Sequence, residues 1–121
     1  MTQIRFALAQ IDTCVGDLAG NAAKVLDYTR RAAGEHARVV VFPEMTLTGY
    51  PIEDLALRRT FRQAAWNQAN ELAAALAEEG LGELYVAVGT VGTDPETSKP
   101  RNRMVVLHEG VVWAGYDKHF L

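Results

Sequence analysis

Two charged residues in this 121-residue sequence follow apolar segments, where a β-sheet would present them at an edge. The first, Glu44, comes after Val39-Val40-Val41-Phe42, a β-branched run that favours a buried parallel strand. Pro43 has no backbone N–H, so it ends the ladder and fixes the turn that presents the glutamate. Open α/β sheets bind ligands at this carboxyl edge, whereas a solvated loop glutamate is the simpler alternative.

The second charged residue, Lys118, follows the apolar segment Val112-Trp113-Ala114. A lysine at a sheet edge can supply a positive charge to an oxyanion, but most loop lysines point into water. The residues alone leave both interpretations open. His36, His108 and His119 do not share a metal-ligand spacing, so no metal site is expected.

The spacing of apolar and turn-forming residues predicts an α/β fold with a mixed sheet. Asn21 is expected to cap a helix that runs to about Ala33. Pro51 is expected at the first position of a short helix, and Thr60 with Gln63 forms a T-x-x-Q capping box before a longer one. The expected strands span 4–10, 39–42, 84–91, 103–107 and 111–116, with a tight hairpin turn at 108–110.

The composition is that of an ordinary globular domain and excludes several classes of partner. Hydrophobic residues make up 49% and charged residues 22% of the chain, and the net charge is −3. The sequence has no basic cluster for nucleic acid and no apolar run long enough for a membrane span. The single cysteine, Cys14, excludes an internal disulfide framework and fits a reducing compartment, so a cytoplasmic protein is expected.

Four segments of the sequence are informative together: the opening segment, residues 39–55 (V-V-V-F-P-E-M-T-L-T-G-Y-P-I-E-D-L), residues 101–104 and residues 116–121. They resemble signatures of the nitrilase, or carbon-nitrogen hydrolase, superfamily, and they stand in that family's order. Residues 39–55 are similar to the surroundings of the family's catalytic glutamate. The opening segment, with A-L-A-Q, V-G-D and Asn21, fits the usual entry of such proteins, and residues 101–104, R-N-R-M, match a strand start loosely. Residues 116–121, Y-D-K-H-F-L, are similar to the Y-x-K-x-x-L motif that holds the catalytic lysine.

This resemblance implies a nitrilase-like α-β-β-α sandwich, of which the chain would form the N-terminal portion, a mixed sheet flanked by helices. Family members hydrolyse amides with a Cys-Glu-Lys triad. Glu44 would be the general base, and Lys118 would stabilise the oxyanion of the tetrahedral intermediate. We therefore expect these two side chains to leave adjacent strands and to lie within charge-pairing distance of each other.

The nucleophilic cysteine of the family follows the lysine. Residues 1–121 are therefore expected to be the N-terminal part of a carbon-nitrogen hydrolase domain that ends before its nucleophile. Cys14 lies in the loop after the first expected strand and is interpreted as a structural or incidental thiol. Such a piece would have no turnover of its own. Its uncovered sheet face and strand edges predict a homo-oligomer or marginal stability.

Within the superfamily, the segment after Glu44 is most similar to the glutaminase domain of glutamine-dependent NAD synthetases, which commonly have Pro where this chain has Ile52. This likeness implies L-glutamine as the substrate, with ammonia passed on for ATP-dependent amidation of deaminated NAD. ATP and Mg²⁺ would bind in a synthetase domain absent from this chain, and no cofactor is expected here. Tyr50 and Asp54 are expected at the substrate entrance, with core or capping roles as the alternative.

Two other functions remain open on the sequence. One is a stand-alone amidase of the same superfamily that acts on small linear amides. The other is a non-catalytic nitrilase-fold fragment that serves in binding or assembly, although the intact Glu44 and Lys118 argue against it.

Overall fold

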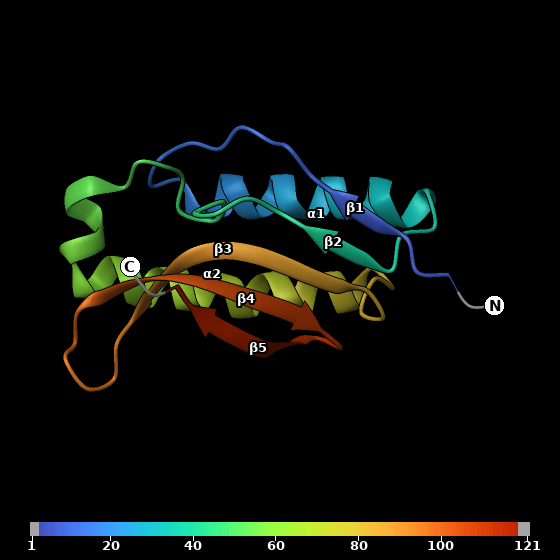
Figure 1. Ribbon diagram of the computed structural model, residues 1–121. Coiled ribbons are helices and arrows are strands. Elements are labelled where there is room, and N and C mark those ends of the chain that lie inside the picture. Colours follow the sequence, from blue (N-terminus) through green and yellow to red (C-terminus); the bar gives the residue numbers. More distant parts are fainter. Residues whose placement is uncertain (1–2, 119–121) are drawn as a thin grey trace.

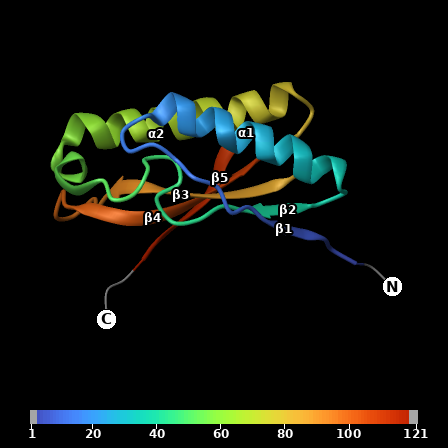
Figure 2. The same ribbon diagram turned by 90° about the horizontal axis from the view of Figure 1, so that it is seen from above.

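The chain forms a five-stranded sheet with two α-helices over one of its faces (Figure 1, Figure 2). The computed structural model describes residues 3–118, so His119 and the rest of the lysine motif lie outside the described residues. The elements are β1 (Phe6–Leu8), α1 (Leu18–Gly34), β2 (Val39–Val41), the 3₁₀ helix η1 (Glu53–Leu57), α2 (Arg59–Glu78), β3 (Tyr85–Thr93), β4 (Pro100–His108) and β5 (Val111–Asp117).

The predicted α/β class with a mixed sheet is confirmed. The strands lie in sequence order, with β1, β2 and β3 parallel, while β4 pairs antiparallel with both β3 and β5. β5 therefore runs in the same direction as β2 and β3. As a result, the carboxyl ends of β2, β3 and β5 and the amino end of β4 share one edge of the sheet, and this edge positions the candidate site.

The hydrophobic core lies between the helices and the sheet. α1 buries Val25, Thr29 and Ala32, as its periodicity predicts. Within residues 3–118 no helix covers the other face of the sheet (Figure 2). On that face, Phe6 and Leu8 of β1 are 60% and 72% exposed, while Ala7 between them packs on the core. These two layers match one helical layer and one sheet of the expected sandwich. No helix within residues 3–118 has the length and apolar character to cross a membrane.

Asn21 is not the N-cap of α1, and the prediction that it would be is wrong. The helix begins earlier, and its cap is Asp17, whose carboxylate accepts from the backbone N–H of Gly20 at 3.0 Å. Asn21 is fully buried, and its carboxamide bonds both the N–H and the carbonyl of Cys14 and, at 3.0 Å, the carbonyl of Leu47. Asn21 thus ties the loop after β1 to the loop that carries Glu44.

We expect Asn21→Leu to lower the free energy of unfolding by about 2–4 kcal/mol, because it leaves three backbone groups without their partner, two in part-buried bonds and one in a buried bond. Chemical denaturation of the full-length natural protein measures this loss. The matched control is Asn67→Ala on α2, where the exposed carboxamide only accepts from Gln63. A change at Asn21 as small as that at Asn67 would contradict the assigned role.

Two other predicted helix starts are corrected. α2 begins at Arg59 with no side-chain cap, so Thr60 lies inside its first turn and the capping box does not form. The Gln63 side chain instead donates to Asn67 at 3.0 Å. The short helix exists as η1 but begins at Glu53, after Ile52, so Pro51 precedes it in the loop.

Candidate active site

Glu44 and Lys118 meet at the shared sheet edge. The Nζ atom of Lys118 lies 2.6 Å from Oε1 of Glu44, which confirms the predicted charge-pairing distance. The prediction that they leave adjacent strands is wrong: Glu44 follows β2 and Lys118 follows β5, with β3 and β4 between them. The loop after β2 must therefore reach across β3.

Gly89 in β3 permits this crossing. The loop leaves the ladder after Phe42, whose N–H donates to Ala87, and returns where the N–H of Leu47 donates to the carbonyl of Gly89 at 2.9 Å. A Cβ atom on Gly89 would lie 2.5 Å from the backbone N of Met45, closer than real Cβ atoms come to backbone. The absence of a side chain at Gly89 therefore lets the Glu44 loop lie directly on β3.

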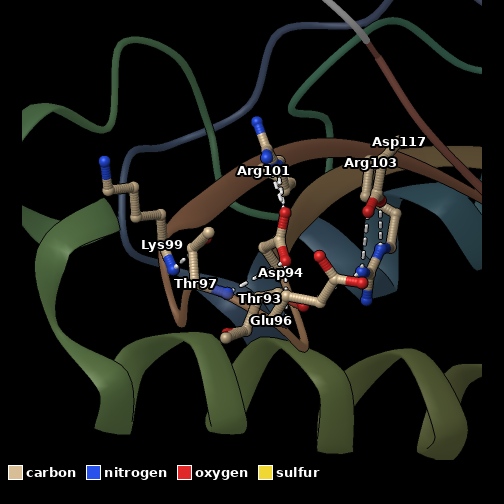
Figure 3. A network of polar contacts seen from close by, with 8 residues as sticks. All are labelled: Thr93, Asp94, Glu96, Thr97, Lys99, Arg101, Arg103 and Asp117. Carbon is tan, nitrogen blue, oxygen red and sulfur yellow. Dashed lines mark hydrogen bonds and ion pairs between the residues drawn. The ribbon is translucent and has the colours of Figure 1, made fainter.

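Lys118 is held by the hairpin of β4 and β5. The backbone N–H of Lys118 donates to the carbonyl of Asn102 at 2.8 Å. One residue earlier, Asp117 pairs with Arg103 across the two strands, at 2.5 Å and 3.1 Å (Figure 3). The ion pair lowers the pKa of the Asp117 carboxyl through the hydrogen bond from Arg103. The start of the Lys118 side chain is therefore fixed relative to β4.

Asn102 is a third polar residue at the site, and the residue-level reasoning missed it. Its side-chain Nδ2 donates to Oε2 of Glu44 at 3.1 Å, so the two carboxylate oxygens of Glu44 have different partners. The only signal in the sequence was the loose match of the R-N-R-M segment to a family strand start. Asn102 contributes both its side chain, to Glu44, and its backbone carbonyl, to Lys118.

The electrostatics keep both members of the pair charged. The hydrogen bond from Lys118, followed by that from Asn102, lowers the pKa of the Glu44 carboxyl below its usual range. The same hydrogen bond raises the pKa of the Lys118 ammonium. At neutral pH Glu44 is therefore an ionised proton acceptor beside a cation. Both side chains are about half exposed, at 56% and 53%, so the pair adds little to folding stability.

A cavity of about 510 Å³, here called the Glu44 cavity, opens at this pair. Glu44, Asn102 and Lys118 line it together with Tyr50, whose side chain is largely exposed. Asp54 does not line the cavity, although its neighbour Glu53 does. The structure thus brings Tyr50 to the expected entrance but not Asp54, and a contact of either with substrate stays a prediction.

Residues 5–121 match the carbon-nitrogen hydrolase family, so the chain belongs to that family. Among similar curated proteins is the glutamine-dependent NAD(+) synthetase of Acinetobacter baylyi, 30% identical over all of this chain and 21% of its own length. That of Mycobacterium tuberculosis is 35% identical over 98% of this chain and 17% of its own length. The chain spans about a fifth of the length of these relatives.

Solved structures show the same fold. A glutamine-dependent NAD(+) synthetase from Cytophaga hutchinsonii superposes with a TM-score of 0.86 at 24% identity, over 99% of this chain and 20% of that one. An amidase from Nesterenkonia superposes with a TM-score of 0.72 at 22% identity, over 98% of this chain and 43% of that one. The nitrilase-like fold expected from the sequence is therefore confirmed.

Proposed function

We propose that the full-length natural protein hydrolyses the side-chain amide of L-glutamine and supplies the ammonia for ATP-dependent amidation of deaminated NAD. The observation that carries this proposal is the Glu44–Lys118 pair in the lining of the Glu44 cavity, in a chain similar over its whole length to glutamine-dependent NAD synthetases. ATP and Mg²⁺ are assigned to the synthetase part of the protein, and no step at Glu44 depends on them.

In this proposal, Glu44 accepts the proton of a cysteine thiol, and the thiolate attacks the amide carbon of glutamine. Lys118 stabilises the oxyanion of the tetrahedral intermediate, and the protonated Glu44 returns its proton to the leaving amine, so the intermediate collapses to a thioester and releases ammonia. Glu44 then takes a proton from water, and hydrolysis of the thioester gives glutamate and the free thiol. The family resemblance implies that the nucleophile follows Lys118 in the full-length natural protein, and the proposed mechanism does not use Cys14.

The direct test supplies the full-length natural protein with L-glutamine, deaminated NAD and ATP, and follows glutamate and NAD together. We expect NAD formation from glutamine and equally from added ammonia. Glutamate release without any NAD formation would favour the second candidate, a stand-alone amidase, which the fold of the Nesterenkonia amidase supports. Absence of hydrolysis of glutamine and of small linear amides would contradict both.

Asn102 is proposed as a positioning residue for Glu44, because its amide orients the carboxylate and lowers the pKa of that carboxyl. Removing the bond in Asn102→Ala destabilises the charged form of Glu44, so the pKa of the carboxyl rises. The acid limb of the kcat/KM profile with glutamine should therefore shift to higher pH, and kcat should fall by roughly tenfold. An unshifted acid limb, with a loss equal at every pH, would indicate a purely structural role for Asn102.

A further inference from the structure

A second cavity, of about 300 Å³, lies between the first turn of α2 and the carboxyl half of β3. We call it the Arg62 cavity, and its lining includes Arg59, Arg62, Thr90 and Arg103. It shares only Val91 with the described lining of the Glu44 cavity. Its volume is at the lower end of the range of small-ligand sites.

The lining of the Arg62 cavity carries positive charge without compensation. Three arginines line it, and among the described residues no Asp or Glu does. Arg103 is neutralised by Asp117, as Figure 3 shows. Arg59 is exposed, and its side chain has no ion-pair or hydrogen-bond partner in residues 3–118. Two guanidinium charges, those of Arg59 and Arg62, therefore remain without a carboxylate.

Arg62 is the more unusual of the two, because it is only 5% exposed. Its guanidinium donates to Thr93 Oγ1 at 2.7 Å and to the carbonyls of Ala56 and Ser98 at 2.6 Å and 3.0 Å. All three acceptors are neutral. A buried charge that has hydrogen bonds but no counter-charge still carries a desolvation cost, which a bound anion would offset.

Thr90 gives an independent indication of a ligand. It is 2% exposed, and its hydroxyl oxygen is buried without a hydrogen-bond partner in the described part of the chain. Thr90 lines the same cavity as Arg62, and its unused hydroxyl can donate one hydrogen bond to a bound oxygen. The lining of one small cavity therefore includes both a residue with an unmet donor and a guanidinium without a counter-charge.

The amino end of α2 adds a positive electric field to the positive charge of the Arg62 cavity. Arg58 is its cap residue without a side-chain hydrogen bond, and the first turn contains no acidic residue. The amino end of a helix is its positive pole, so arginines there are unfavourable unless an anion lies nearby.

On these grounds we propose that the Arg62 cavity binds a phosphate-class oxyanion, either free phosphate or a phosphoryl group of a larger molecule. Arg62 and Thr90 contact its oxygens, and Arg59 closes the mouth.

Titration calorimetry of the full-length natural protein with inorganic phosphate, at constant ionic strength in chloride, tests the site. We expect saturable binding with one phosphate per chain. Arg59→Gln and Thr90→Val should weaken it by about five- to tenfold each, because each removes one donor to a charged oxygen. Thr90→Ser keeps the hydroxyl and should restore binding. Arg62 is left unchanged, since its removal would disturb the fold.

Arg58→Gln is the matched control, because Arg58 has the same charge at the same helix end but does not line the cavity. It should change the affinity by less than about twofold, the effect of a screened surface charge. Competition by adenosine monophosphate would identify a phosphoryl group as the natural source, and its absence would identify the free ion. No saturable phosphate binding, or equal losses in Arg58→Gln and Arg59→Gln, would overturn the proposal whether or not glutamine is hydrolysed.

Discussion

Lys118→Ala in the full-length natural protein is expected to lower glutamine-supported NAD formation by about 10²- to 10³-fold, the effect of losing one oxyanion-stabilising group. Ammonia-supported NAD formation should be unchanged, because ammonia bypasses amide cleavage. Glu44→Gln should have the same pattern, since a neutral amide cannot accept the proton of the thiol. Both rates are measured on the same preparation, with glutamine and with an ammonium salt.

Because Glu44 and Lys118 are exposed, their variants test activity with little effect on folding stability. Both side chains are about half exposed, so breaking their bond should change the free energy of unfolding by less than about 1 kcal/mol. Lys99→Ala is the matched control, because Lys99 is an exposed lysine in the loop before β4 that does not line the Glu44 cavity. If both NAD-forming activities fell together in folded variants, Glu44 and Lys118 would be structural; surviving glutamine-supported activity would exclude them from the triad.

Much of the fold was predictable because its signals are periodic and local. The inner face of α1, the β-branched run of β2 and the hairpin of β4 and β5 each follow from residues close in sequence. The hairpin turn illustrates this, since Glu109 and Gly110 both have positive φ, as a two-residue turn of type I′ requires. The ends of the strands also follow from the local sequence, so Glu44 and Lys118 could both be assigned to an edge of the sheet.

The helix caps were not predictable, because tertiary contacts compete for the same residues. Asn21 has the residue type of a cap, but two loops supply three backbone partners for its carboxamide, and burial among them decides its place. Thr60 and Gln63 have cap spacing, but α2 begins at Arg59, two residues too early for Thr60 to be its cap. A capping motif reports a local preference that a stronger distant contact overrides.

The geometry of the site was predictable only in part. The sequence places Glu44 and Lys118 after strands, but it does not say that two further strands separate them. The close approach depends on Gly89, which in the sequence is one of two glycines in the apolar run of residues 84–92. Asn102 was missed for a related reason, since its partner Glu44 is far away in the chain and only the sheet order brings them together.

The second large effect is expected at Gly89, where the loop that carries Glu44 crosses β3. Gly89→Ala should lower the free energy of unfolding by about 3 kcal/mol or more, because the new Cβ would lie 2.5 Å from the Met45 nitrogen and the Pro43 carbonyl oxygen. Neither contact involves a flexible side chain that could turn aside. The loop must lift from β3, and this carries Glu44 away from Lys118, so glutamine-supported NAD formation should fall with stability. Thermal unfolding and the glutamine assay measure the two effects.

Gly115→Ala is the matched control for Gly89→Ala. Gly115 also lies in a strand, but a Cβ atom there would meet only the Met104 carbonyl oxygen, at an ordinary 3.8 Å. The control carries the same loss of backbone freedom in the unfolded chain, so any difference between the two variants reports the contact with the loop. We expect Gly115→Ala to change stability by less than about 1 kcal/mol and to keep the activity with glutamine. If the two alanine variants behaved alike, the Glu44 loop would not rest on β3, and its reach to Lys118 would need another cause.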